Sequence, residues 1–220
     1  MILFYNTIID TIARDNFDNN IIPLIGKSRK YEIIHVTNDF PITNKYTHLI
    51  LTGSELSASA GSKWDEKIMN LITLFANANK PILGICHGHQ MIARTFGGAC
   101  RKTAIPEFSW RKIKISQNPI FTGINNPIFL ESHYDEVHNL TDKFEIIATN
   151  EDCKIQGFQI KNRPIWGIQF HPEMNLQNGN KMINEHLEKN PQDRIYYKNQ
   201  LSNDKQLKQN FLIFKNFFSL

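Results

Sequence analysis

The sequence predicts a three-layer αβα fold, in which helices cover both faces of a mostly parallel β-sheet. Short runs of apolar, β-prone residues, such as residues 46–52, alternate along the chain with segments of helical periodicity, such as residues 64–78. This alternation is typical of parallel sheets, because each crossover helix covers one face of the sheet. A tight turn at residues 162–163, just before the apolar run 165–170, adds an antiparallel hairpin late in the chain.

Length and composition indicate a single globular domain. A chain of 220 residues with 41% hydrophobic and 21% charged residues can bury a sizeable core. The net charge of +4 is small and the basic residues are scattered, which gives nucleic-acid binding no support. No apolar run approaches a membrane span, and the first residues lack the basic lead of a signal peptide. The three cysteines form no Cys-x-x-Cys pair and favour a reducing, cytoplasmic location over a disulfide framework or zinc site.

Residues 81–90 predict a strand, a sharp turn and a helix, with Cys86 at the turn. They read Pro-Ile-Leu-Gly-Ile-Cys-His-Gly-His-Gln, and the following residues favour a helix that ends at a glycine pair. Gly84 and Gly88 have no Cβ, so the strand and the helix can approach closely around a strained turn. Because a helix N-terminus favours thiolate, Cys86 is the candidate nucleophile.

A candidate base and an orienting carboxylate follow about 85 residues later. The run 165–170 reads as a buried strand, and His171-Pro172-Glu173 follows its C-terminal end. Residues two apart in extended chain point the same way, so the His171 and Glu173 side chains can act together. His171 would accept the Cys86 proton and later protonate a leaving amine, while Glu173 would hold the imidazole in the right tautomer.

These two motifs resemble those of the class I (triad) glutamine amidotransferases, whose turn reads much like Gly-Ile-Cys-x-Gly-His-Gln and whose base lies in a His-Pro-Glu turn. The resemblance runs over roughly residues 40–175 and implies a flavodoxin-like fold with the site at the C-terminal edge of the sheet. It implies glutamine hydrolysis by a Cys86-His171-Glu173 triad through a thioester, without metal or cofactor. Ammonia would pass to a synthetase on a separate polypeptide, since this sequence holds no Gly-rich ATP loop.

The resemblance also assigns the oxyanion hole to the backbone N–H groups of Ser54 and His87. The family commonly has Gly-Gly-Pro where this chain has Gly53-Ser54-Glu55, so the sequence leaves open whether the hole is preformed. Gly53 is a candidate substrate-binding residue. Gln90 matches a residue that contacts the substrate glutamine, or it simply packs in its helix. The His87 side chain tunes the thiolate, borders the substrate or is solvated.

Residues 131–137, Glu-Ser-His-Tyr-Asp-Glu-Val, resemble the Ser-His-x-Asp-x-Val segment of the amidotransferase domain of GMP synthase. In the family this segment is a loop that lines the glutamine pocket, which makes Ser132 and His133 candidate substrate-binding residues. Asp135 faces a partner domain or caps a turn. A GMP-synthase-type synthetase is accordingly the expected ammonia acceptor.

The tail departs from the family pattern after Glu173. Residues 178–203 are polar, rich in Asn and Lys, and contain a possible helix at 181–188. We interpret them as an insertion before a closing helix at 204–219, within one amidotransferase-like domain spanning residues 1–220. The insertion is either a surface loop or a lid or docking element, and the small-residue loop at 57–62 can flex over the site.

Two other functions stay open at this stage. A standalone γ-glutamyl hydrolase or peptidase would use the same chemistry without a partner. A degenerate, non-catalytic relative would act in a regulatory role; the complete triad argues against this, whereas Ser54, Glu55 and the unusual tail keep it open.

Overall fold

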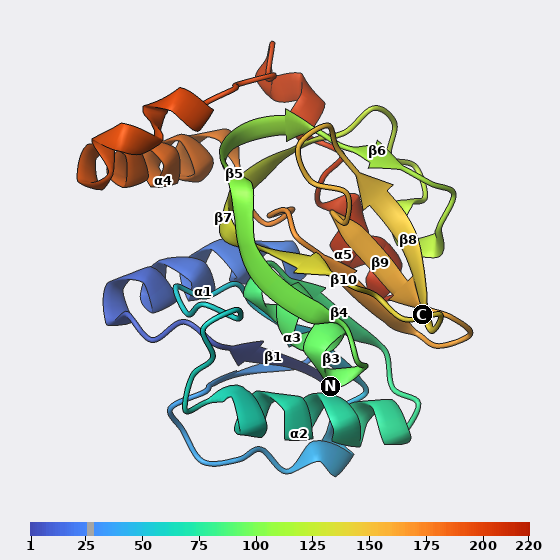
Figure 1. Ribbon diagram of the computed structural model, residues 1–220. Coiled ribbons are helices and arrows are strands. Elements are labelled where there is room, and N and C mark those ends of the chain that lie inside the picture. The colour runs from blue at the N-terminus through green and yellow to red at the C-terminus, as the bar shows by residue number, and fades with distance from the viewer. Residues whose placement is uncertain (26–28) are drawn as a thin grey trace.

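The computed structural model describes residues 1–25 and 29–220 and arranges them in three layers around a central sheet (Figure 1). Within these residues the sheet has eight strands, in the order β2 (Tyr31–His35), β1 (Ile2–Asn6), β3 (His48–Leu51), β4 (Ile82–Ile85), β10 (Ile165–Ile168), β9 (Gly157–Ile160), β8 (Phe144–Thr149) and β6 (Lys114–Ile115). The strands from β2 to β10 pair in parallel, and those from β10 to β6 pair antiparallel. The predicted αβα fold, with a mostly parallel sheet and a late hairpin, is confirmed.

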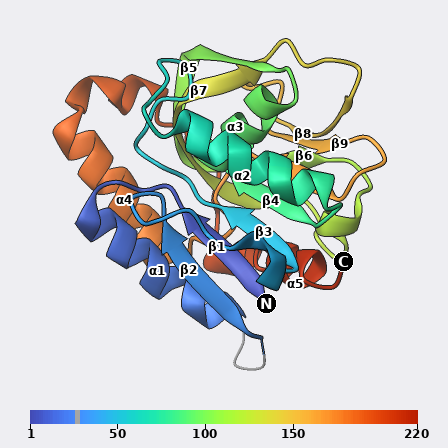
Figure 2. The same ribbon diagram turned by 90° about the horizontal axis from the view of Figure 1, so that it is seen from below.

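Helices cover both faces of the sheet (Figure 2). Helices α1 (Thr11–Ile25) and α5 (Leu212–Phe217) pack on the face that receives Ile2 and Phe4 of β1, whereas α2 (Asp65–Asn77) and α3 (His87–Thr95) pack on the face that receives Leu3 and Tyr5. Successive β1 side chains therefore feed two separate apolar clusters, as the period of a strand requires. Of the helices in the described part of the chain, none has the length and apolar character needed to cross a membrane.

A second sheet lies beside the first and consists of two long antiparallel strands, β5 (Ala99–Lys112) and β7 (Ile128–His138). The register shifts between Lys102 and Glu107. The segment 131–137, expected as a loop, is part of β7, so that prediction was wrong. Several of its polar residues lie opposite polar residues on β5, for example His133 opposite Glu107, so a hydrophobicity pattern does not reveal this strand.

The C-terminal part packs against the second sheet rather than lying loose on the surface. Helix α4 (Leu176–Lys189) includes the possible helix at 181–188, and two 3-10 helices follow, η3 (Pro191–Tyr196) and η4 (Asp204–Leu207). Apolar side chains join α4 and η4 to β5 and β7 in a third cluster: Trp110, Ile128, Leu130, Ile183, Leu187 and Leu207. The surface-loop interpretation is therefore wrong for α4, and the expected closing helix divides into η4 and the shorter α5.

Candidate active site

Cys86 lies at the sharp turn between β4 and α3, at the C-terminal edge of the sheet. Its φ of 51° and ψ of −106° are strained values for a residue with a Cβ. A Cβ on Gly84 would lie 2.5 Å from the backbone of Gly88, and one on Gly88 would lie 2.7 Å from Leu51. These glycines thus permit the close approach of strand and helix that the sequence predicted, and α3 begins directly after Cys86.

His171 and Glu173 lie at the same edge, because β10 is the neighbour of β4 in the sheet. The Cys86 N–H donates to the Ile168 carbonyl at 2.8 Å, which ties the two strand ends together. His171 Nδ1 donates to Glu173 Oε1 at 2.7 Å, and both side chains are almost fully buried. A Cβ on Gly53 would lie 3.1 Å from the His171 ring and 3.9 Å from Cys86 Sγ, so the ring and the thiol converge beside Gly53.

The electrostatics of this group favour the protonated form of His171. Burial opposes the charged form of His171, but the Glu173 carboxylate and the Cys86 sulfur outweigh burial and raise the pKa of His171 well above its usual value. His171 Nε2 is buried and has no hydrogen-bond partner within the described residues, so it is available to a reacting group. In general, a protonated imidazole beside a cysteine favours the thiolate, which is the form of cysteine that acts as a nucleophile.

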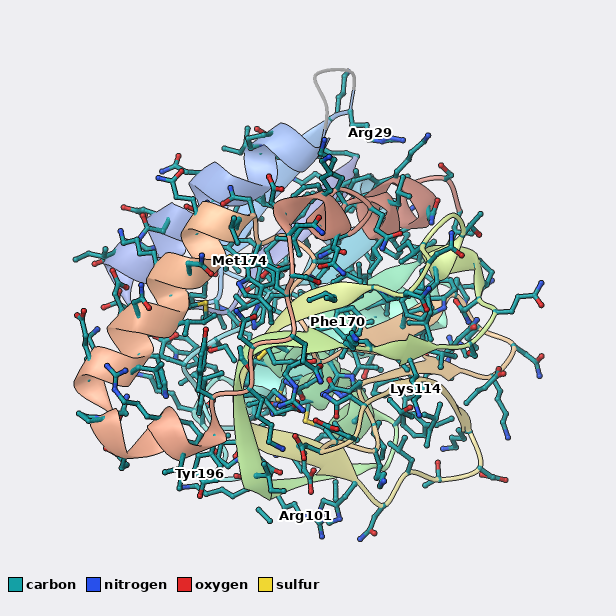
Figure 3. All side chains as sticks on the ribbon, turned by 90° about the horizontal axis from the view of Figure 1, so that it is seen from above. Arg29, Arg101, Lys114, Phe170, Met174 and Tyr196 are labelled. Atoms are coloured by element: carbon teal, nitrogen blue, oxygen red, sulfur yellow. The ribbon has the colours of Figure 1, made fainter. Side chains whose placement is uncertain are left out.

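The chain segment that carries His171 runs from the core to the base of α4. Figure 3 shows Phe170 near the middle of the molecule and Met174 beside α4. The Phe170 ring stacks on Phe129 at 4.1 Å, which anchors the segment on the protein interior. The position of the catalytic candidates is therefore set by core packing on one side and by α4 on the other.

The loop after β3, with the candidate oxyanion donor Ser54, is held by its own side chains. Ser54 Oγ donates to the Thr7 carbonyl at 2.7 Å and accepts from the Leu56 N–H. The backbone of Ser54 does not take a positive φ, so serine fits this position without the conformation that favours glycine. Gly53 is the position where a Cβ would crowd His171.

The Glu55 side chain also holds the loop after β3 in place. Its Oε1 accepts from the backbone N–H groups of Ile9, at 2.8 Å, and Asp10, at 2.6 Å. The departure from the family pattern at Glu55 thus has a structural use, because the carboxylate ties the loop to the segment that leads into α1.

The His87 side chain is buried, so the solvated alternative is wrong. Its Nδ1 lies 3.4 Å from Thr7 Oγ1, and burial lowers the pKa of His87 to about 4. A neutral imidazole therefore stands next to the nucleophile, and the backbone N–H of His87 is at the first position of α3.

A chain of side-chain amides leads from β7 to the nucleophile. Gln90 Nε2 donates to the Asp135 carbonyl at 3.0 Å and to Gln169 Oε1 at 3.1 Å, and Gln169 Nε2 donates to Cys86 Sγ at 3.5 Å. Gln169 was not predicted as a site residue. A polar residue inside the otherwise apolar run 165–170 was the signal that could have found it.

Ser132 and His133 reach the site in different ways. The Ser132 carbonyl is 3.9 Å from Cys86 Sγ. The His133 side chain is buried in an ion cluster, where its Nε2 lies 3.2 Å from Glu107 and 3.3 Å from Glu131. Burial opposes the charged form, but the two carboxylates outweigh it and raise the pKa of His133 to about 10.

The ion cluster has the residue types of a metal site, since Glu107, Glu131 and His133 offer ligand atoms close together. His133 Nδ1 donates to the Asp135 carbonyl at 3.1 Å, so a protonated His133 has no lone pair left for a metal. Arg111 Nη1 also lies 3.6 Å from Glu107 and contributes positive charge. We therefore interpret the cluster as ion pairing rather than metal binding.

Asp135 caps a turn, as one of its two predicted roles required. Its carboxylate accepts from Ser57 Oγ at 2.7 Å and from the N–H and hydroxyl of Ser59 at 3.0 and 2.8 Å. These bonds hold the loop 57–62 against β7, so the loop that was expected to flex is anchored at this end.

A cavity of about 670 Å³ opens above Cys86 and contains most of the predicted site residues. Gly53, Ser54, Cys86, Gln90, Ser132, His133, His171 and Glu173 line it. The loop before α1 and α1 itself form one side, and α4 forms another through Lys181, Met182 and His186. The cavity is large enough for a small polar substrate beside the nucleophile.

The structure thus combines a strand–cysteine–helix turn with a buried His–Glu pair at one edge of a mostly parallel sheet. The sequence matches the family described as "Glutamine amidotransferase class-I" over residues 8–190. The chain therefore belongs to the class-I glutamine amidotransferase family.

Several curated relatives are named as one subunit of a glutamine-hydrolyzing GMP synthase. The protein of Methanosphaera stadtmanae is 33% identical over 150 residues, which cover 67% of this chain and 81% of the relative. That of Methanocaldococcus jannaschii is 36% identical over 54% of this chain and 64% of the relative. That of Thermoplasma acidophilum is 46% identical over 44% of this chain and 49% of the relative. The match thus spans only about half to two thirds of several of these relatives.

Solved structures show the same fold. A candidate GMP synthase subunit from Thermoplasma acidophilum aligns over 100% of this chain and 93% of its own, with a TM-score of 0.73 and 25% identity. A glutamine amidotransferase from Thermotoga maritima aligns over 100% of this chain and 96% of its own, with a TM-score of 0.77 and 17% identity. Both similarities include the C-terminal part that carries α4.

Proposed function

We propose that this chain is a glutaminase that hydrolyses the side-chain amide of glutamine and delivers ammonia to a separate synthetase. The observation that carries the proposal is the convergence of Cys86, at a strained strand–helix turn, with the hydrogen-bonded His171–Glu173 pair. Family membership favours this activity over a standalone γ-glutamyl hydrolase or a non-catalytic relative.

The geometry supports a thioester mechanism. The Cys86 thiolate attacks the amide carbon, and the N–H groups of Ser54 and His87 stabilise the oxyanion that forms. The His171 imidazolium gives its proton to the leaving nitrogen, and ammonia departs as the C–N bond breaks. Neutral His171 then takes a proton from water, the hydroxide attacks the thioester, and glutamate and the Cys86 thiolate are released. Glu173 holds the His171 ring throughout.

The substrate would lie in the cavity above Cys86. Gly53 leaves room beside the thiol, while Gln90 and Ser132 line the wall. His133 contributes through its backbone, because its side chain is committed to Glu107 and Glu131. Each step of this chemistry is carried by the chain's own groups and needs neither a metal nor a cofactor.

The partner would be the synthetase component of a GMP synthase. The support is that relatives such as the Methanosphaera stadtmanae protein are named as one subunit of a glutamine-hydrolyzing GMP synthase. The chain would act as one domain of residues 1–220, with 178–203 as an insertion whose helix α4 forms a wall of the cavity.

A coupled assay tests the proposal. The chain is mixed with the synthetase component of a GMP synthase, and product formation is measured with glutamine or with ammonium salt as nitrogen source. We expect Cys86→Ala to abolish the glutamine-dependent reaction and to leave the ammonium-dependent reaction unchanged. Equal glutamine-dependent rates for the wild type and the variant would refute the assignment.

A further inference from the structure

A series of hydrogen bonds runs from the Asp135 carbonyl through the Gln90 and Gln169 side-chain amides to Cys86. The groups at its start decide which group of each amide donates and which accepts. It starts at the Asp135 backbone carbonyl, an oxygen that can only accept. The Gln90 group 3.0 Å from that oxygen must therefore be its NH₂. The other hydrogen of this NH₂ points to Gln169 at 3.1 Å, so Gln169 must present its oxygen to Gln90. The NH₂ of Gln169 is then left to face Cys86 Sγ, at 3.5 Å.

Burial makes this direction difficult to reverse. Gln169 has no exposed surface and Gln90 is 3% exposed, so solvent does not offer alternative partners. Turning either amide over would place two oxygens, or two NH₂ groups, against each other in a buried site, which is costly.

The start of this hydrogen-bond series, the Asp135 carbonyl, is held by the charged His133 side chain. The Asp135 carbonyl also accepts from His133 Nδ1, which must then carry a proton. His133 Nε2 faces Glu107 and Glu131, which can only accept when ionised, so it carries a proton as well. The imidazolium thus fixes the Asp135 carbonyl, and through it the orientation of both glutamines.

We propose that Gln169 is a further catalytic residue, whose side-chain N–H donates to the sulfur of Cys86 and stabilises the thiolate, and that Gln90 and His133 are positioning residues that aim it. This inference rests on the proposed function, because it takes Cys86 as the nucleophile. The donor acts at two steps: it favours the thiolate before attack, and it stabilises the sulfur as it leaves when the thioester is hydrolysed.

A structural role for Gln169 predicts something different. Its backbone N–H donates to the Gln156 carbonyl at 2.8 Å, and the side chain fills space beside α3. If packing were its only role, a side chain of similar size without an N–H would keep the reactivity of the sulfur.

The test compares Gln169→Met with a matched control, Gln159→Met. Methionine keeps the length and removes the donor. Gln159 is on the neighbouring strand β9, where its side chain bonds Asn118 and the Arg163 carbonyl rather than Cys86. The rate of iodoacetamide modification of Cys86 is measured by peptide mass spectrometry from pH 5 to pH 9 on the folded protein. Circular dichroism checks the fold of each variant.

In Gln169→Met, we expect the pH profile of Cys86 modification to move to higher pH by about one unit. Below the midpoint of the profile, this shift makes modification about tenfold slower. We expect kcat for glutamine to fall in parallel. Gln159→Met should match the wild type. Gln90→Met, which keeps the Gln169 donor and frees its orientation, should shift the profile in the same direction by less and serves if Gln169→Met does not fold.

Other charged groups face the same cavity and stay unchanged in these variants. His171 converges with the sulfur beside Gly53 and is hydrogen-bonded to Glu173. The surrounding elements contribute further charged groups, among them Asp10, Glu55, Lys102, Asp135, Lys181 and His186. A shift in the Gln169 variant therefore reports the lost donor.

Cys100 and Cys153 provide an internal reference for the outcome. Burial raises the pKa of Cys100 to about 12 and raises that of Cys153 further, so both should react slowly. If wild-type Cys86 reacts no faster than Cys100, the proposed nucleophile fails. If Cys86 is reactive and its profile is the same in Gln169→Met and Gln90→Met, the donor role is overturned while the proposed function stands.

Discussion

At the residue scale, the proposed activity depends on the proton that the His171 imidazole holds. Burial alone would discharge the imidazole, and the Glu173 carboxylate at 2.7 Å is what reverses this effect together with the sulfur. Glu173 is therefore a determinant of the protonation state of the site as well as of the ring orientation.

Removing the Glu173 charge should disable the base. We expect Glu173→Gln to lower kcat for glutamine by about 10²- to 10⁴-fold, because the imidazolium loses its main stabilising charge and its fixed tautomer. KM should change little, since Glu173 does not bind the substrate in this mechanism. Steady-state kinetics measure both constants, and Glu145→Gln on the exposed side of β8 is the control. Undiminished kcat in Glu173→Gln would contradict the triad.

The buried ion cluster should make stability depend on pH. The pKa of His133 rises from 6.5 to about 10 in the folded protein, so its stabilising contribution is complete below pH 6.5 and is lost as the pH rises toward 10. Burial raises the pKa of Glu131 from 4.5 to about 7, which removes stability in the same direction between these values.

We therefore expect the thermal unfolding midpoint to fall from pH 6 to pH 9, as measured by scanning calorimetry. His133→Gln should reduce this decline above pH 6.5 and leave the part that the raised pKa of His171 contributes, whereas His138→Gln, at the half-buried end of β7, should keep the whole decline. A midpoint that rises with pH over this range would show that the cluster is not charged as described.

The convergence of Cys86, His171 and Glu173 could be predicted because each residue lies in a short motif whose geometry is local. Gly84 and Gly88 indicate the turn around Cys86, and the two-residue spacing of His171 and Glu173 predicts that their side chains pair. The contact of Gln169 with Cys86 could not be predicted, because it depends on the direction of amides from two elements. The burial of His133 depends on Glu107, which is distant in sequence but lies directly opposite His133 on the paired strand β5.

At the scale of elements, α4 forms part of the cavity wall and depends on close packing against β5. A Cβ on Gly179 would lie 2.4 Å from Trp110, so α4 approaches β5 only because this position lacks a side chain. Trp110 Nε1 also donates to Asn180 at 2.8 Å. The His186 ring stacks on Phe108 at 3.7 Å and bonds Asp193 of η3, which fixes the far end of α4.

Gly179→Ala should displace α4. We expect a net loss of about 1 kcal/mol or more in the free energy of unfolding, because the clash with Trp110 outweighs the better helix propensity of alanine. KM for glutamine should rise as the cavity wall shifts. Urea unfolding and steady-state kinetics measure the two effects, and Glu188→Ala on the exposed face of α4 is the control. Equal stability of Gly179→Ala and wild type would show that Trp110 yields easily.

The elements that were predicted well are those with a clear apolar period, such as α2 and the strands of the main sheet. Strand β7 was missed over residues 131–137 because several of its buried positions carry charged or polar residues, namely Glu131, His133, Asp135 and Glu136. Their partners lie on other elements, such as Glu107 of β5 for His133 and the loop 57–62 for Asp135. The start of α4 at Leu176 depends on the Asn175 side chain, which accepts from the Asn178 N–H at 2.9 Å. Neither feature leaves a hydrophobic pattern in the sequence.

At the scale of the whole molecule, strand order brings the two halves of the site together. Strand β4 pairs with β10, with Ile85 beside Ile168, so the turn after one strand meets the segment after the other at the same edge. Parallel pairing could be predicted from the alternation of strands and helices, and it places the site at the C-terminal edge. The second sheet and α4 then enclose that edge and convert it into a cavity.

The most direct measurement is the release of glutamate and ammonia from glutamine by the purified chain, with and without the synthetase component of a GMP synthase, for wild type and Cys86→Ala. We predict release by the wild type, faster when the synthetase is present, and none above background by Cys86→Ala under either condition. Release that persists in Cys86→Ala, or its absence from the wild type even with the synthetase, would contradict the assignment of Cys86 as the nucleophile of a glutaminase.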